Sequence, residues 1–235
     1  MKVSIITSCY NQGHYLSEAI QSALGQIFSK YDYEIVAVND GSTDNTAAVL
    51  EGFAGNIKVI TQENRGLEAA SNAGIKESTG EYVIRLDADD AFTEKLLLVE
   101  TLFLDYNPDF GFVYSDYFVG DVWNEASTIF KLPQFDPDEI KQRGDFLATG
   151  TMYRRECLEA VGLYDESWKN NRLENYELIL RLINQRYKGY RIRIPLFFYR
   201  KQNNNKPDSD HPIWKVGEEL GKKYGFQYKV NRFRP

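Results

Sequence analysis

The sequence is poor in the residues that form disulfides and histidine-based metal sites. It has two cysteines and two histidines in 235 residues, too few for a disulfide-rich scaffold or a site built on histidine ligands. Cys9 and Cys157 lie far apart and lack the spacing of metal ligands. We therefore expect both to be small buried side chains in a reducing compartment.

Long apolar runs are also absent. No stretch approaches the roughly 20 apolar residues that span a bilayer. The short apolar run after Lys2 breaks at Thr7 and Ser8, which is unlike a signal peptide. Because 235 residues can bury one good core, we expect a single cytoplasmic domain over residues 1–235.

Charge is distributed unevenly along the chain. The net charge is -6, yet the segment from Arg186 onward carries +9 and the residues before it carry -15. The basic segment is either a solvated surface or a surface for an anionic partner, such as the face of a membrane or a diphosphate-bearing acceptor. Nucleic acid is not expected as a partner, because the N-terminal acidity opposes it and no recognition motif is present.

Strand and helix patterns alternate regularly in the first hundred residues. Strands separated by helices imply right-handed βαβ units and a parallel sheet, so we predict an α/β fold. Ligands of such sheets bind beyond the carboxyl ends of the strands. Strands are expected over residues 3–8, 34–38, 57–61 and 82–86, and helical periodicity runs over residues 16–24 and 97–105.

The pattern loosens after residue 110. The segment 120–144 contains polar residues and proline and is expected to be a loop with one short helix, and the Asn-rich segment 201–210 is expected to be a second loop. We predict strands over residues 112–116, 147–153 and 191–199, and helices over residues 136–142, 173–185 and 213–224.

Three aspartates follow the strand predicted at 82–86. Asp87, Asp89 and Asp90 fall within four residues. Ionised carboxylates this close repel one another and are costly to desolvate, so they need a cation or several hydrogen-bond donors. A divalent metal bound to a phosphorylated ligand would supply both. Asp90 is either a second metal ligand or the cap of the following helix.

Asp40 takes the corresponding position after the strand predicted at 34–38. Asp44 is explained by capping the helix that begins near Asn45, but capping does not explain Asp40. A carboxylate at this place can accept an N–H group from a base such as uracil. Tyr10, at the neighbouring strand end, is either a ring for stacking on that base or a tyrosine of the core or rim.

Five segments, in this order and spacing, resemble the family 2 glycosyltransferases, which are inverting enzymes with a GT-A fold. The segments are VSIITSCYNQGHYLSEAIQSALGQ, VAVNDGSTDNT, ENRGLEAASNAGI, GEYVIRLDADD and GTMYRRECLEAVGLYDE. The resemblance runs over residues 3–200. It implies a Rossmann-like, mostly parallel sheet flanked by helices. It also implies transfer of a sugar from a nucleoside diphosphate, expected to be UDP, to a hydroxyl of a glycan or lipid-linked acceptor.

The resemblance assigns donor-binding roles to the strand ends and divides the chain by function. It implies that the base is bound near Ser8, Tyr10 and Asp40, and that Arg65 approaches the diphosphate. Residues 1–110 would form the nucleotide-binding half and residues 111–200 the acceptor-side half. Residues 201–235 would form a basic loop and helix, a candidate for contact with the inner face of a membrane.

Asp87 and Asp89 match the two aspartates of the family's D-x-D motif. The resemblance implies that Asp89 ligates Mg²⁺ or Mn²⁺ and that Asp87 lies nearer the ribose, as a second candidate ligand. A hard divalent ion held by carboxylates and phosphate oxygens neutralises the charge that builds on a departing nucleoside diphosphate.

The family's general base commonly lies in a Glu-Asp pair at the start of a late helix. Here the pair reads Glu174-Asn175, and an asparagine cannot accept the proton. We therefore assign the role of general base to Glu174. The alternative is that its negative charge only stabilises the helix by interacting with the positive end of the helix dipole. Glu177 is expected to pair with Arg181 one turn later.

A second departure follows the last predicted strand. Many relatives read Tyr-Arg-x-His there, whereas this chain has Gln202 in place of the histidine, so Arg200 or Lys201 is a candidate to hold the diphosphate. Both departures leave open a nucleotide-sugar-binding protein with weak or no transferase activity. A nucleotidyltransferase is disfavoured, because no Gly-rich loop followed by a basic residue comes after the first strand.

Overall fold

The computed structural model describes residues 1–30, 32–121, 127–143, 147, 149–168, 173–200 and 213–228. The strands in this part of the chain are β1 (Val3–Cys9), β2 (Tyr33–Asp40), β3 (Lys58–Gln62), β4 (Tyr82–Arg85), β5 (Ala91–Phe92), β6 (Phe112–Val119), β7 (Thr128–Phe130), β8 (Met152–Arg154) and β9 (Gly189–Tyr199). The helices are α1 (Gly13–Leu24), α2 (Thr46–Glu51), α3 (Leu67–Lys76), α4 (Leu96–Tyr106), α5 (Pro137–Arg143), α6 (Arg155–Ala160), α7 (Glu174–Asn184) and α8 (Ile213–Tyr224), and a 3-10 turn spans Glu166–Trp168.

The described strands form one sheet in the order β3-β2-β1-β4-β8-β6-β9-β5, with β7 paired to β6. β1, β2, β3 and β4 run parallel, and β6 pairs parallel with β9. β8 joins these two groups by antiparallel pairing to β4 and β6. The predicted α/β fold with a mostly parallel sheet is confirmed.

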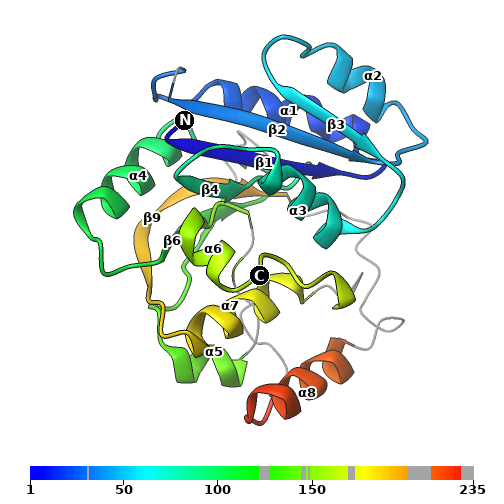
Figure 1. Cartoon of the computed structure of the whole chain (residues 1–235). Helices are drawn as coiled ribbons and strands as arrows, with labels where there is room; N and C mark the ends of the chain where they lie inside the picture. Colours follow the sequence, from blue (N-terminus) through cyan, green and yellow to red (C-terminus); the bar gives the residue numbers. More distant parts are fainter. Residues whose placement is uncertain are drawn as a thin grey trace.

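Helices cover both faces of the parallel strands. Figure 1 shows α3 in front of β1 and β2 and α1 behind them. β1 and β2 are accordingly buried along nearly their whole length, as continuous apolar runs of a two-sided parallel sheet should be. Within the described part of the chain, no helix is long and apolar enough to cross a membrane.

The register brings the polar strand ends to one edge of the sheet. Cys9 of β1 pairs with Asn39 of β2, and Asp40 pairs with Gln62 of β3. β4 lies on the other side of β1 and runs in the same direction. Its last residue, Arg85, therefore lies at the end of the strand that faces this edge. The motifs that follow the four strands therefore converge.

The structure differs from the predicted elements near the aspartate run and near residue 150. The predicted strand over 147–153 is confirmed only at Met152 and Tyr153: Gly150 has a φ of 76°, in the left-handed region, and residue 148 lies outside the described residues. Only Met152–Arg154 forms a strand. The aspartates are followed by the two-residue strand β5, and α4 begins at Leu96. The interpretation of Asp90 as a helix cap is therefore wrong.

The C-terminal helix α8 was predicted with its observed bounds and packs against α7. Figure 1 shows α8 below α7, and Tyr224 of α8 donates to Glu177 of α7 (2.8 Å). Leu220 is fully buried, and the ring of Tyr176 contacts the rings of Phe226 and Tyr228. The exposed positions of α8 carry both positive and negative charges. The net positive charge of the C-terminal segment is therefore small on this helix. These exposed residues are Lys215, Glu218, Glu219, Lys222 and Lys223.

Candidate functional site

A pocket of about 260 Å³ opens at the carboxyl ends of β1 and β2. Three predicted site residues, Ser8, Tyr10 and Asp40, line it together with Asn64 and Leu67. The structure thus brings together the group expected to bind a base. Its lining combines polar side chains with the apolar Leu67 and Ala70, which is the usual make-up of a site for a small organic ligand.

Asp40 shapes the pocket as well as lining it. Its side chain is buried, and Oδ1 accepts hydrogen bonds from Nε2 of Gln62 (2.7 Å) and from the N–H of Arg65 (2.9 Å). Oδ2 accepts one from the N–H of Gly66 (2.8 Å). A carboxylate has about four acceptor positions, so one position on Oδ2 stays open to a ligand. Asp40 therefore fixes the loop before α3 and has one acceptor position left; its role toward a base stays a prediction.

The turn after Asp40 requires glycine. Gly41 has a φ of 74°, and a Cβ atom there would lie 2.7 Å from the N atom of Asn64, which is closer than real Cβ atoms come. The N-cap of α2 is Asn45 and not Asp44, but the carboxylate of Asp44 accepts from the N–H of Thr46 (2.9 Å), the first residue of α2, and also from the N–H of Gly13 (3.1 Å). The Thr46 hydroxyl is the main cause that lowers the pKa of Asp44.

Tyr10 and Ser8 differ in how they meet the pocket. The side chain of Tyr10 is 49% exposed, so it is a rim residue and the interpretation as a core tyrosine is wrong. Its ring is available for stacking on a planar ligand. The hydroxyl of Ser8 lies 3.2 Å from the hydroxyl of Ser71 on α3, which holds it at the pocket wall.

Arg65 lies next to the pocket with its guanidinium at the surface. Its Nη2 atom lies 3.0 Å from Oε2 of Glu166, and the other oxygen of Glu166 accepts from Nδ2 of Asn72 (3.0 Å). Exposed pairs of this kind contribute roughly 0 to 1 kcal/mol. A phosphate group at the pocket mouth can therefore compete with Glu166 for Arg65.

Asp87 and Asp90 have different surroundings. Asp87 is half-buried, and its N–H donates to the hydroxyl of Thr149 (3.0 Å). Asp90 is fully buried and accepts from the N–H of Arg200 (3.0 Å). Burial first, and then the nearby charges of Asp89 and Asp87, raise the pKa of Asp90 well above its usual value. Asp90 therefore faces the protein interior, whereas Asp87 and Asp89 are half-buried.

The aspartates fit a divalent metal that arrives with a ligand. Within the described part of the chain, no three Asp, Glu, His or Cys side chains are arranged to hold a metal ion by themselves. Mg²⁺ is usually held by one or two carboxylates, with phosphate oxygens and water completing its shell. Two half-buried carboxylates, Asp87 and Asp89, match that donor set. Their role as metal ligands stays a prediction.

Arg85, the last residue of β4, joins two of the predicted site residues. Its Nε atom lies 2.8 Å from Oδ1 of Asp87, and its Nη1 atom lies 3.2 Å from Oε1 of Glu174. The guanidinium side chain is only 7% exposed. Burial alone would lower the pKa of Arg85, but the two carboxylates hold it well above the usual value. The sequence signal was a charged residue inside an otherwise apolar strand.

Asn175, the departure from the family pattern, lies behind Glu174. It is buried, accepts a hydrogen bond from the hydroxyl of Tyr164 (3.3 Å), and its Nδ2 atom donates to Oε1 of Glu174 (3.4 Å). Burial, as the largest cause, raises the pKa of Tyr164 to about 12, so its hydroxyl stays protonated. The neutral amide of Asn175 thus adds a second donor to Glu174, beside Arg85.

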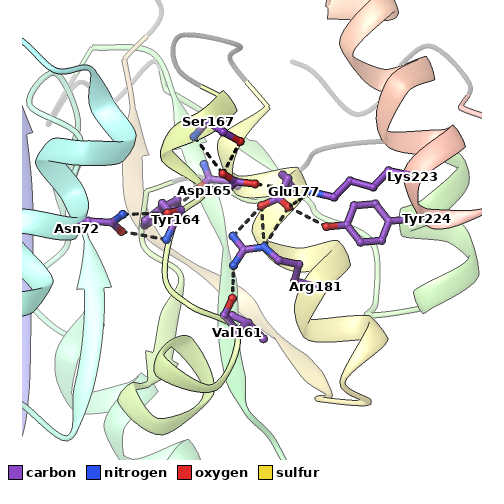
Figure 2. A network of polar contacts seen from close by, with 10 residues as sticks. Asn72, Val161, Tyr164, Asp165, Ser167, Glu177, Arg181, Lys223 and Tyr224 are labelled. Carbon is purple, nitrogen blue, oxygen red and sulfur yellow. Dashed lines mark hydrogen bonds and ion pairs between the residues drawn. The ribbon is translucent and has the colours of Figure 1, made fainter.

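The predicted pair between Glu177 and Arg181 is confirmed and belongs to a larger network. Glu177 is buried and accepts from Nε of Arg181 (2.8 Å to Oε2) and from the hydroxyl of Tyr224 (2.8 Å). Figure 2 shows Lys223 reaching the same carboxylate from α8, and Lys223 also pairs with Asp165 (3.7 Å). These contacts connect α7 to α8 and lie outside the pocket.

The side chain of Arg200 already contacts other residues of the protein. Its Nε atom donates to the carbonyl oxygen of Asp89 (3.0 Å), its guanidinium pairs with Glu18, and it lies 4.7 Å from the ring centre of Tyr15. It therefore anchors the aspartate loop to α1, which disfavours a role in holding a diphosphate. Lys201 and Gln202 lie outside the described residues.

Comparisons with known proteins agree with this geometry. The family described as "Glycosyl transferase family 2" matches residues 4–162. A Nostoc sp. protein named "Uncharacterized glycosyltransferase alr2836" is 40% identical over 173 residues, which cover 68% of this chain and 53% of that protein. The chain thus spans about half the length of this relative.

Two solved structures share the fold. The crystal structure of S. aureus TarS 1-349 in complex with UDP-GlcNAc has a TM-score of 0.74 at 19% identity, covering 95% of this chain and 66% of that one. The mannosyltransferase PcManGT from Pyrobaculum calidifontis, in complex with GDP-Man and Mn²⁺, has a TM-score of 0.68 at 16% identity, covering 97% of this chain and 65% of that one. Together, the fold, the converging strand ends and the matched family motifs identify the chain as a member of glycosyltransferase family 2.

Proposed function

We propose that this protein is an inverting glycosyltransferase. It would move a sugar from a nucleoside-diphosphate donor, expected to be a UDP-sugar, to a hydroxyl of a glycan or lipid-linked acceptor. The observation that carries the proposal is the pocket lined by Ser8, Tyr10 and Asp40, which opens at the same sheet edge as Asp87 and Glu174. The TarS complex with UDP-GlcNAc supports the donor class.

Each pocket residue has a chemical role toward the nucleotide. The open acceptor position of Asp40 suits the N–H of a uracil, and the exposed ring of Tyr10 suits stacking on its face. Arg65, at the loop that Asp40 fixes, offers a guanidinium for phosphate oxygens. These contacts would bind the donor with its sugar directed toward Asp87.

Asp89 and Asp87 are the residues that would hold Mg²⁺ or Mn²⁺ with the donor. When bound, the metal supplies positive charge that offsets the charge developing on the leaving diphosphate. The PcManGT complex with GDP-Man and Mn²⁺ supports this assignment. Arg85 fixes the carboxylate of Asp87 in place through a contact of 2.8 Å.

Glu174 is the proposed general base. It begins α7, with its side chain 9% exposed at the edge of the site. The carboxylate would accept the proton of the acceptor hydroxyl as that oxygen attacks the anomeric carbon, while the bond to the nucleoside diphosphate breaks on the opposite side. One such displacement inverts the configuration at that carbon.

The test is a screen of nucleotide-sugar donors that measures released nucleoside diphosphate with Mn²⁺, with Mg²⁺ and with EDTA. We expect release from a UDP-sugar in the presence of metal and a loss of roughly a hundredfold or more in Asp89→Ala. Release that is independent of metal and survives this substitution would overturn the proposed donor site.

A nucleotide-sugar-binding protein without turnover is the second candidate, because Asn175 replaces the family's acidic residue. Calorimetric binding of UDP-sugar without nucleotide release from any donor and acceptor would favour it. The partition into a nucleotide half (1–110), an acceptor-side half (111–200) and a basic C-terminal part (201–235) belongs to the same proposal. Contact of that basic part with an anionic membrane face at the cytoplasmic side is checked by sedimentation with phosphatidylglycerol vesicles.

A further inference from the structure

Arg85 is a charged group that contacts both the donor-side residue Asp87 and the proposed base Glu174. On one side it meets Asp87, through Nε (2.8 Å to Oδ1) and Nη2 (3.2 Å to Oδ2). On the other side Nη1 meets Glu174 (3.2 Å to Oε1). Because a guanidinium is planar and rigid, these contacts set the two carboxylates at fixed places relative to each other.

The surroundings allow Arg85 little freedom. It ends β4, and its backbone is held in the sheet opposite Ile6 of β1. The ring centre of Tyr164 lies 6.0 Å from the guanidinium carbon, and the hydroxyl of Tyr164 donates to Asn175 behind Glu174. A buried cation with few ways to move is a good template for two anions.

We propose that Arg85 is a positioning residue that holds the donor-side carboxylate of Asp87 and the base Glu174 through a single guanidinium. It touches no substrate and acts through the two carboxylates. This inference rests on the proposed function. Arg85→Lys keeps the positive charge but loses the several N–H donors of the planar guanidinium. We therefore expect it to weaken both sugar transfer and donor binding.

The activity arm is a double-mutant cycle with Glu174→Gln. We expect Arg85→Lys to lower kcat by about tenfold to a hundredfold in the wild-type background, since a small misplacement of a reacting group is costly. In the Glu174→Gln background the same change should cost less than about twofold, because the base through which Arg85 acts is gone.

The binding arm uses UDP with Mn²⁺ in isothermal titration calorimetry and needs no turnover. Arg85→Lys should raise the Kd for UDP by about threefold to tenfold in the wild type and by less than about twofold in Asp87→Asn. Additive effects in either arm overturn the proposal that one guanidinium serves both carboxylates.

The matched control is Arg191→Lys in β9. Arg191 is also an arginine of the sheet paired with a buried aspartate, since its Nε and Nη2 atoms lie 2.7 Å and 2.8 Å from the carboxylate oxygens of Asp116. It should lower the unfolding temperature without changing kcat or the Kd for UDP by more than about twofold. Equal losses in both variants would assign the Arg85 effect to stability and overturn the proposal.

Thermal denaturation followed by circular dichroism shows whether each variant folds. If Arg85→Lys does not, a cycle between Asp87→Asn and Glu174→Gln replaces it, and positioning through Arg85 predicts non-additive changes in the Kd for UDP. If the wild type neither turns over nor binds UDP, the proposed function fails and this inference with it. If the wild type is active and a cycle is additive, only this inference fails.

Discussion

At the scale of single residues, the most unusual group outside the site is Glu100. It lies on the buried face of α4 with no exposed surface, and neither of its carboxylate oxygens has a hydrogen-bond partner among the described residues. Burial raises the pKa of Glu100 well above its ordinary value of 4.5. Over the pH range between the two pKa values, the side chain of Glu100 is therefore protonated in the folded protein and ionised in the unfolded chain.

This difference makes stability depend on pH. The contribution of Glu100 is fully present below about pH 4.5 and is lost as the pH rises through the higher pKa of the folded state. We expect Glu100→Gln to raise the free energy of unfolding by about 1 to 3 kcal/mol at pH 8 and to have little effect at pH 4. Urea denaturation at both pH values measures this.

The control for this prediction is Glu159→Gln on α6, whose side chain is 59% exposed. It should change the free energy of unfolding by less than about 0.5 kcal/mol at either pH. A gain for Glu100→Gln that is the same at pH 4 and pH 8 would contradict titration as its cause.

Site residues could be predicted from the sequence where a polar side chain follows an apolar strand. Tyr10 and Asp40 were found in this way and Ser8 by the family resemblance, and the structure gathers them around one pocket. Arg85 was missed because it lies inside the apolar run. Its partner Glu174 is 89 positions away, and such a distant contact leaves no local pattern in the chain.

At the scale of elements, the contact between α7 and α8 depends on a buried carboxylate. Glu177 accepts the hydroxyl of Tyr224 at 2.8 Å. Burial is the main cause that raises the pKa of Tyr224, and the bond to Glu177 adds to it, so the hydroxyl stays a donor across the physiological range. The helix α8 is thus held to the helix that begins with Glu174.

We expect Tyr224→Phe to lower the free energy of unfolding by about 1.5 to 3 kcal/mol, because it removes one donor from a buried charged group. Thermal and urea denaturation at pH 7 measure the loss. Tyr106→Phe on α4 is the matched control, since that side chain is 80% exposed and its loss should be under about 0.5 kcal/mol. Equal losses for both variants would contradict the role of the Glu177 contact.

Elements with a strong period or a clear boundary were predicted well. α8 was found with its observed bounds, and α4 and α7 within one residue at each end. The helix α3 was not predicted, and two further errors fall on short segments fixed by tertiary pairing. β5 has two residues and exists because it pairs with β9, and the segment over 147–153 turns at Gly150, where the backbone leaves the strand region. The strand propensity of the residues carries little information about β5 or about the turn at Gly150.

At the scale of the whole molecule, β9 completes the sheet although it follows the family-matched residues 4–162. It pairs with β6 along its length and with β5, and its apolar residues Leu196 and Phe197 are buried. A chain ending at residue 162 would therefore leave β6 without its long parallel pairing to β9 and an apolar sheet face exposed.

We expect residues 1–162 expressed alone to lack the single cooperative unfolding transition of the full chain. Circular dichroism during heating and differential scanning calorimetry measure this. Addition of residues 163–228 in one chain should restore the transition, because that segment supplies β9, α7 and α8. A fragment of residues 1–162 that unfolds cooperatively with a similar enthalpy per residue would contradict the prediction.

The contacts of Arg200 also determine when the site can assemble during folding. This residue meets Glu18, 182 positions earlier in the chain, and Asp90, 110 positions earlier. Loops of this length are slow to close compared with local helices and hairpins. On a ribosome the aspartate loop emerges well before the strand that anchors it. Its nascent form therefore lacks the geometry fixed by Arg200, and we expect the proposed metal and donor site to form only after β9 has joined the sheet.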